Sequence, residues 1–158
     1  MRVSILTISD SVAGGKAEDR SGALVADRCL AIGWTVVARS VLPDDRGAIE
    51  RYLKQVCDSS VADVILTTGG TGLGPRDVTP EATMAVSDRL IPGLPELMRN
   101  EGHRKTPRAI LSRSAAGICG STMIINLPGS PRGAVESLDV IADLLPHALD
   151  VLHGARHD

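Results

Sequence analysis

Short apolar runs alternate with longer amphipathic stretches along this chain. The first run, residues 3–8, is mostly aliphatic and shows little alternation, which is typical of a parallel strand buried on both faces. Residues 34–42 and 61–68 have a similar apolar, β-branched character, and residues 109–111 and 122–127 form shorter runs of the same kind. These runs predict the strands of a mostly parallel sheet.

Helical periodicity fills the segments between these runs. In residues 18–32 the apolar side chains return on one helical face, and Gly33 stands where such a helix would end. Residues 49–56 place apolar side chains at i, i+3, i+4 and i+7, which predicts a second amphipathic helix. Three further helices are predicted. One follows Thr79, which would cap it, and a second covers residues 96–104. The third begins near Pro131, and Pro146 would split it.

Strands that alternate with helices in this way predict a three-layer α/β/α fold with a mostly parallel sheet. The chain has 158 residues, of which 43% are hydrophobic, so we assign residues 1–158 to a single domain. The first apolar run is too short for a signal peptide or a membrane span. We therefore expect a cytoplasmic protein that does not enter a membrane.

Charge and composition exclude several classes of partner. The formal net charge is -2, so no global positive field attracts nucleic acid or an anionic membrane. Trp34 and Tyr52 are the only aromatic residues, which leaves no platform for stacked bases. Cys29, Cys57 and Cys119 are widely spaced among apolar residues and indicate reduced core side chains. We expect no nucleic-acid function.

The glycine-rich segment that follows the third predicted strand is the strongest candidate for chemistry. In parallel α/β sheets, ligands bind beyond the carboxyl ends of the strands. Gly69, Gly70 and Gly72 lack a Cβ, so consecutive backbone N–H groups there can approach an anion closely, and Thr71 adds a hydroxyl. The segment therefore predicts a phosphate-binding loop, although glycines after a strand also make simple tight turns.

Two well-known phosphate loops do not fit this segment. Pro75 and Arg76 stand where a P-loop requires Lys and Ser or Thr. Pro75 also occupies the place of the last glycine of a dinucleotide-binding fingerprint. The loop is consequently of another kind.

Asp77 and Asp44 are the carboxylates of interest. A carboxylate beside a phosphate site is unfavourable unless a cation lies between them, so Asp77 suggests Mg²⁺, which takes one or two carboxylates together with phosphate oxygens. As an alternative, Asp77 would be a charge near a helix N-terminus. Asp44 taken alone fits an ordinary Pro-Asp turn. The spacing leaves these alternatives open.

Other polar residues lie at strand ends or in loops. Ser9 and Asp10 follow the first strand and would either bind a ligand or cap a turn, and the sequence does not decide between the two. Ser112, Arg113 and Ser114 offer two hydroxyls and a cation, which suit a second phosphate or acidic group, although a polar segment need not be functional.

Four segments in order carry a resemblance to a known family. They are ISDS with EDRSG, TTGGTGLGPRDVTPEA, LSRSAAGI and IINLPGSP. Together they closely resemble the molybdenum-cofactor biosynthesis proteins that adenylylate molybdopterin, and the resemblance covers essentially the whole chain. It implies transfer of AMP from Mg-ATP to the terminal phosphate of molybdopterin, with release of pyrophosphate. It also implies a homotrimer and a molybdate-insertion enzyme as a candidate partner.

The resemblance also implies roles for single residues. Asp44 and Asp77 match the essential acidic residues that organise Mg²⁺ and the nucleotide phosphates, although Asp45 follows Asp44 and either of the two could face the metal. The remaining candidates would bind phosphates (Gly69, Gly70, Thr71, Gly72), the nucleotide (Asn126, Pro128, Gly129), the pterin (Ser112, Arg113, Ser114) or substrate at the first strand end (Ser9, Asp10).

Two alternative functions remain at this point. One is a non-catalytic molybdopterin-binding or scaffolding relative of the same fold, against which the presence of both Asp44 and Asp77 counts. The other is the related molybdate-insertion enzyme, whose similar domain sits within a much longer multidomain chain.

Overall fold

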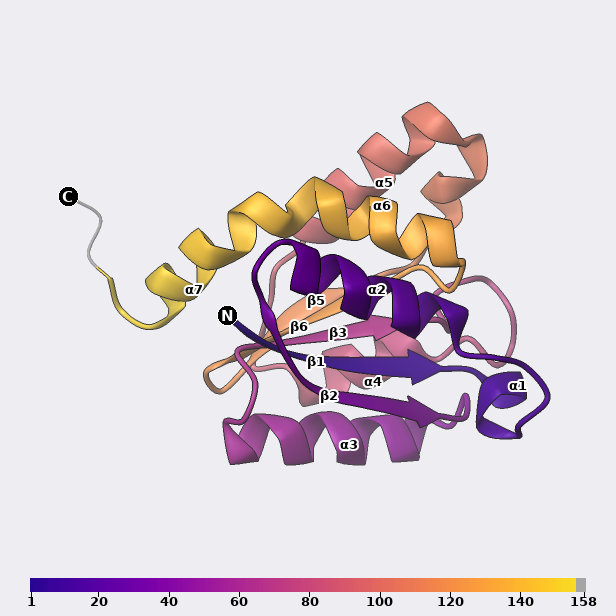
Figure 1. Cartoon of the computed structure of the whole chain (residues 1–158), viewed down its shortest axis with the longest axis horizontal. Coiled ribbons are helices and arrows are strands. Elements are labelled where there is room, and N and C mark those ends of the chain that lie inside the picture. Colours follow the sequence, from indigo (N-terminus) through magenta and orange to yellow (C-terminus); the bar gives the residue numbers. More distant parts are fainter. Residues whose placement is uncertain (156–158) are drawn as a thin grey trace.

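The computed structural model describes residues 1–155, and its strands form one six-stranded sheet (Figure 1). The strands are β1 (Arg2–Ile8), β2 (Thr35–Leu42), β3 (Val64–Thr68), β4 (Arg89–Leu90), β5 (Ala116–Cys119) and β6 (Thr122–Leu127). Their order across the sheet is β2-β1-β3-β6-β5-β4. Strands β2, β1, β3 and β6 run parallel to one another. Strand β5 pairs antiparallel with β6, and β4 pairs antiparallel with β5 at the edge of the sheet. The predicted three-layer α/β fold is confirmed.

Helices cover both faces of the sheet. On one face lie α2 (Arg20–Ala31), α5 (Gly93–Lys105), α6 (Pro131–Ile141) and α7 (Leu145–Leu152), and on the other lie α3 (Arg46–Ser59) and α4 (Thr79–Val86). The short α1 (Asp10–Ala13) follows β1, and the 3₁₀ helices η1 (Pro107–Leu111) and η2 (Ala142–Leu144) follow α5 and α6.

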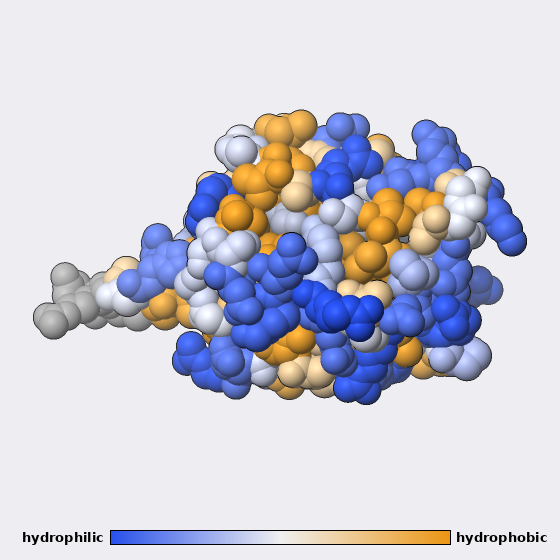
Figure 2. All heavy atoms as spheres, turned by 90° about the horizontal axis from the view of Figure 1, so that it is seen from below, coloured by the Kyte–Doolittle hydropathy of each residue, from blue (hydrophilic) through white to orange (hydrophobic). Residues whose placement is uncertain are grey.

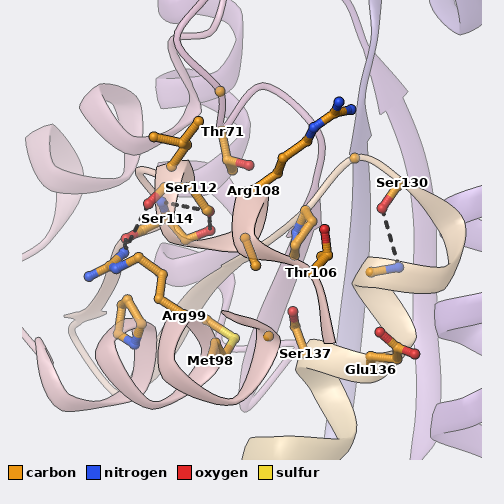
Figure 3. A pocket seen from close by; sticks show the side chains of 18 of the residues that line it. Thr71, Met98, Arg99, Thr106, Arg108, Ser112, Ser114, Ser130, Glu136 and Ser137 are labelled. Atoms are coloured by element: carbon orange, nitrogen blue, oxygen red, sulfur yellow. Dashed lines mark hydrogen bonds between the residues drawn. The ribbon is translucent and has the colours of Figure 1, made fainter. Parts of the chain in front are cut away.

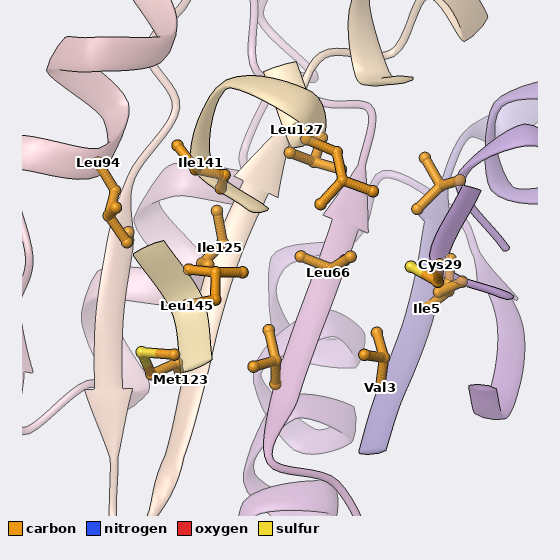
Figure 4. Packing of buried hydrophobic residues seen from close by; sticks show 14 of the residues in the cluster. Val3, Ile5, Cys29, Leu66, Leu94, Met123, Ile125, Leu127, Ile141 and Leu145 are labelled. Carbon is orange, nitrogen blue, oxygen red and sulfur yellow. The ribbon is translucent and has the colours of Figure 1, made fainter. Parts of the chain in front are cut away.

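The central strands are buried on both faces, which explains their unbroken apolar runs. Successive side chains of a strand point to opposite faces, so Val3 and Ile5 of β1 pack under α2 while Leu6 packs against α3. Figure 4 shows Leu66 of β3 and Ile125 of β6 in the first of these two layers. Cys29, Cys57 and Cys119 are free thiols buried in the two layers, as predicted.

One predicted strand is wrong. Residues 109–111 belong to η1, which begins at Pro107 and is held by short-range bonds such as that from the Ala109 N–H to the Thr106 carbonyl, 3.1 Å. Ile110 and Leu111 are 48% and 54% exposed, so their side chains do not enter the core. The strand lies instead at β5, between the two apolar runs 109–111 and 122–127, and it pairs with β6 across Gly120, whose φ is +61°.

Several helix ends also differ from the sequence prediction. The residue before the first turn of α4 is Val78, and the Thr79 hydroxyl does not cap this helix but donates to the Gly69 carbonyl, 2.9 Å away. Helix α5 begins at Gly93, with Pro95 in its first turn, where a missing N–H costs little. Gly33, with φ +85°, ends α2 as expected. Within the described part of the chain, no helix has the length and apolar character needed to cross a bilayer.

Candidate functional site: two hollows that share the glycine loop

The carboxyl ends of the parallel strands carry two adjoining hollows. The large hollow, of about 540 Å³, lies between the glycine loop, α5, η1 and the first turns of α6 (Figure 3). The small hollow, of about 480 Å³, lies between the end of β1, α1, the start of α2 and Asp44. Both volumes fall in the range of small-molecule sites. Gly70, Asp77 and Gly129 line both hollows and form their shared wall.

The shared wall depends on glycines with left-handed backbone conformations. Gly69 has φ +102°, and a Cβ there would lie 2.2 Å from the Ile8 carbonyl oxygen. Gly70 has φ +67°, and a Cβ there would lie 2.2 Å from Thr79 Oγ1. Only glycine allows the loop to pass this close to the end of β1 and the start of α4.

The loop also leaves backbone donors free. Among residues 1–155, no acceptor is hydrogen-bonded to the N–H groups of Gly70, Thr71 or Gly72. Unpaired, closely spaced N–H groups beside a hollow suit an anion. The geometry therefore fits the predicted phosphate cradle.

Asp77 closes the end of this loop. Its Oδ2 accepts from the Gly74 N–H at 2.8 Å, and its own N–H donates to the Gly74 carbonyl at 3.0 Å. A Cβ on Gly72 would lie 2.8 Å from the same Oδ2, so the carboxylate packs directly against the loop. Oδ1 accepts no hydrogen bond from any described residue, and Asp77 lines both hollows.

Asp44 faces Gly70 from the side of the small hollow. Its Oδ2 accepts from the Asp10 N–H at 3.0 Å, while a Cβ on Gly70 would lie 3.1 Å from its Oδ1. Burial raises the pKa of the Asp44 carboxyl, and the nearby carboxylates of Asp10 and Asp77 act in the same direction. The site thus concentrates negative charge that a cation would relieve.

Asp45 points elsewhere. Its Oδ1 accepts from the Ala48 N–H at 2.7 Å and caps α3, and Asp45 does not line either hollow. Of the two neighbouring aspartates, Asp44 therefore lies at the candidate site.

Ser9 and Asp10 both take structural roles beside the small hollow. Ser9 caps α1, because its hydroxyl accepts from the Val12 N–H at 3.3 Å, and it also lines the small hollow. Asp10 returns the bond from Asp44, accepting from the Asp44 N–H at 3.0 Å, and Arg76 binds both of its carboxylate oxygens. Arg76 lowers the pKa of the Asp10 carboxyl.

Ser112 and Ser114 lie on the wall of the large hollow, across from Ser130 (Figure 3). Their hydroxyls are 2.8 Å apart, and Arg99 donates to both of their carbonyls. Arg113, between them in the chain, lines neither hollow and points its guanidinium at the glycine loop. The structure therefore separates Arg113 from the two serines with which it was grouped.

Asn126 does not line either hollow. It is fully buried, and its amide donates to the hydroxyls of Thr67 and Thr83 and accepts from the Ala115 N–H. These bonds tie β6 to β3, α4 and β5. Pro128 lines the large hollow. Gly129 lies on the shared wall, and a Cβ on it would lie 3.2 Å from the Cα of Gly69.

Four cationic residues on the walls were not singled out from the sequence. They are Arg20 in the small hollow and Arg99, Lys105 and Arg108 in the large one. Arg20 belongs to the EDRSG segment and could have been found there, whereas the other three lie on or after a helix whose orientation the sequence does not reveal.

The residues present fit Mg²⁺ shared with a ligand better than a metal held by protein alone. In the described chain, no group of three or more His, Cys, Asp or Glu side chains is placed to hold a metal ion. Asp44 and Asp77 each keep one carboxylate oxygen that accepts no hydrogen bond from residues 1–155. Mg²⁺ commonly takes one or two carboxylates and completes its shell with water and phosphate oxygens.

These features define the class: an α/β protein with a glycine loop suited to an anion, which lies between two hollows at the carboxyl ends of its parallel strands. Residues 4–147 match the family described as probable molybdopterin binding domain. The chain belongs to this molybdenum-cofactor biosynthesis family, which confirms the resemblance drawn from its four sequence segments.

Similar proteins span nearly the whole chain. The molybdopterin adenylyltransferase of Helicobacter pylori J99 is 37% identical over 161 residues, covering 98% of this chain and 89% of that protein. The molybdopterin adenylyltransferase of Escherichia coli K12 is 36% identical over 157 residues, covering 98% and 79%. Among solved structures, the MoaB enzyme of Thermus thermophilus has a TM-score of 0.91 at 48% identity, covering 97% and 96%. The Mog protein of Mycobacterium ulcerans has a TM-score of 0.88 at 39% identity, covering 95% and 97%.

Proposed function

We propose that this chain is a molybdopterin adenylyltransferase, which transfers AMP from ATP to the terminal phosphate of molybdopterin and releases pyrophosphate. The shared wall of Gly70, Asp77 and Gly129 is the observation that carries the proposal. Two substrates held in adjoining hollows would bring their phosphates together over one loop with free N–H donors. Relatives named for this activity support the assignment.

The two hollows suit different substrates. The large hollow offers the hydroxyls of Ser112 and Ser114 and the cations Arg99 and Arg108, which suit the polar edges and phosphate of a pterin. The small hollow offers Ser9, Arg20 and the carboxylate of Asp44, which suit the phosphate tail of a nucleotide. We therefore place molybdopterin in the large hollow and ATP in the small one.

The reaction needs positioning more than a protein nucleophile. An oxygen of the terminal phosphate of molybdopterin forms a bond to the α-phosphorus of ATP, and the bond from that phosphorus to pyrophosphate breaks. The N–H groups of Gly70, Thr71 and Gly72 would hold the phosphate oxygens at which negative charge develops. Hydrogen bonds from Thr79 to the carbonyls of Gly69 and Gly70 would keep these donors in place.

Asp44 and Asp77 would hold Mg²⁺ through the carboxylate oxygens that accept no hydrogen bond from the described residues. A bound Mg²⁺ supplies neutralisation of phosphate charge. Burial, with the nearby carboxylates of Asp10 and Asp77, raises the pKa of the Asp44 carboxyl, and a cation bound beside these carboxylates would favour its charged form. Neither Asp45 nor Asn126 takes part in this arrangement.

Three further expectations stay predictions. The homotrimer and the contact with a molybdate-insertion enzyme come from the resemblance, and the cytoplasmic location comes from the short first apolar run.

Incubation of the purified chain with molybdopterin, ATP and Mg²⁺ tests the proposal. We expect pyrophosphate and adenylylated molybdopterin in equal amounts. If the folded chain binds molybdopterin but yields no product, it is the non-catalytic binding or scaffolding relative instead.

A further inference from the structure

Arg113 lines neither hollow and donates hydrogen bonds to the glycine loop. Its Nε donates to the Gly72 carbonyl at 2.7 Å and its Nη2 to the Asp77 carbonyl at 2.6 Å. Its backbone N–H donates to the Thr71 carbonyl at 2.8 Å. One residue thus fixes the loop near its start and at its end.

The same guanidinium is anchored on α4. Its Nη1 pairs with Oε1 of Glu81 in the first turn of that helix. Burial raises the pKa of the Glu81 carboxyl, but the hydrogen bond and charge of Arg113, together with a backbone hydrogen bond and the charge of Arg46, hold the pKa below its usual value. Oε2 of Glu81 is buried and has no hydrogen-bond partner among the described residues. The carboxylate is therefore committed to Arg113.

Every nitrogen of the guanidinium is consequently engaged by protein oxygens. Arg113 lies on neither hollow, while its neighbours Ser112 and Ser114 lie on the large one. Its place in the chain therefore links the wall of the large hollow to the loop that carries Asp77.

We propose that Arg113 is a positioning residue, which fixes the Gly72–Asp77 turn through its guanidinium fork, and that it does not bind the pterin. The kinetic part of this inference rests on the proposed adenylyl transfer. The three acceptors need donors in one plane, which Arg supplies and Lys does not. Loss of the guanidinium hydrogen bonds to the carbonyls of Gly72 and Asp77 makes the turn mobile and displaces both the Asp77 carboxylate and the free N–H groups.

The first test measures amide hydrogen exchange at Gly74 and Asp77 of the free chain, whose N–H groups are hydrogen-bonded within the turn, and needs no activity. We expect faster exchange in Arg113→Lys than in the wild type. Arg28→Lys is the matched control, because Arg28 is similarly exposed, 39% against 35%, and forms an ion pair with Asp139 away from both hollows. Unchanged exchange in Arg113→Lys overturns the proposal, whatever the activity.

The second test separates positioning from binding. In Arg113→Lys we expect kcat to fall about a hundredfold, as for misplacement by about 1 Å, while the Kd for molybdopterin changes less than threefold. Guanidinium ion added to Arg113→Ala, well below denaturing concentrations, should restore part of kcat. A large rise in the molybdopterin Kd with unchanged kcat would make Arg113 a pterin ligand and overturn the proposal.

A third variant guards against misfolding. Glu81→Gln keeps the acceptor and shape of Glu81 but weakens the anchor, so we expect a smaller change in exchange and in kcat in the same directions. Wild-type protein without adenylyltransferase activity would refute the proposed function, while the exchange measurement would still decide the role of Arg113.

Discussion

At the scale of single residues, the structure separates Asp44 from its neighbour Asp45. Asp44 lines the small hollow, whereas Asp45 caps α3. Asp44→Asn keeps the acceptor for the Asp10 N–H but removes the charge, so we expect the rate of pyrophosphate release to fall on the order of a hundredfold or more.

Asp45→Asn is the matched control, because Asn is as good an N-cap as Asp. We expect its rate and its melting temperature to stay close to those of the wild type. Loss of activity in Asp45→Asn with full activity in Asp44→Asn would reverse the assignment of the two aspartates.

The glycine loop allows a similar comparison. Gly69→Ala combines a φ of +102° with a Cβ 2.2 Å from the Ile8 carbonyl, so we expect the free energy of unfolding to drop by about 2–5 kcal/mol, the sum of backbone strain and overpacking. Gly15 has φ +72° but nothing within 4 Å of an added Cβ, so Gly15→Ala should lose only about 1–2 kcal/mol. Urea denaturation measures both. Equal losses would show that the close approach to β1 is not rigid.

The sequence predicted the position of some candidate residues better than that of others. Glycines and aspartates at strand ends are local signals, and Gly70, Asp44 and Asp77 do lie together on the wall of the small hollow. Asn126 and Arg113 have the same polar character in the sequence, yet their side chains are engaged by residues distant in the chain. Such long-range bonds leave no local pattern, and only the fold shows them.

At the scale of elements, one ion pair fastens the start of β1 to the turn before β3. Asp63 accepts from the Arg2 N–H and from its guanidinium, both at 2.7 Å. Burial raises the pKa of the Asp63 carboxyl, but the bonds from Arg2 outweigh it and the pKa is lowered. A lowered carboxyl pKa means that the pair stabilises the fold above the usual pKa of about 3.9 and that this stability is lost as the pH falls through the folded-state value.

Asp63→Asn should therefore melt at a lower temperature than the wild type at pH 7, and this difference should shrink in strongly acidic buffer. Asp58→Asn breaks the exposed pair with Lys54, whose side chains are 59% and 62% exposed, and should change little at either pH. A difference for Asp63→Asn that does not depend on pH would contradict the charge-based explanation.

Elements with long, regular patterns were predictable, and short ones were not. The aliphatic run of β1 and the periodicity of α3 identify these elements, because burial on both faces or on one face dictates the pattern. β4 has two residues and β5 four, too few for a period to be visible. The strand prediction for residues 109–111 was wrong because these residues belong to the 3₁₀ helix that begins at Pro107, and the side chains of Ile110 and Leu111 are exposed.

At the scale of the whole molecule, both hollows lie at the carboxyl ends of the parallel strands. Seen from the side of α3, the surface is mainly hydrophilic with hydrophobic side chains between (Figure 2). With a net charge of -2, the molecule relies on local groups to bind anions.

The homotrimer inferred from the resemblance is testable by measuring the molar mass in solution.

Two separate hollows predict that both substrates bind at once. A non-hydrolysable ATP analogue with Mg²⁺ and molybdopterin should each raise the melting temperature, and together they should raise it further, since each adds about 2.7 kcal/mol at a hundredfold excess over its Kd. In Asp44→Asn, the Mg²⁺-dependent part of the nucleotide effect should be lost. Competition between the two ligands would show that they share one hollow.

A crystal structure with Mg²⁺ and a non-hydrolysable ATP analogue tests the central claim most directly. We predict that the phosphates lie over Gly70 with the metal between Asp44 and Asp77, and that the α-phosphorus faces the large hollow. Phosphates bound away from the shared wall, or a metal held by Asp45, would contradict the account.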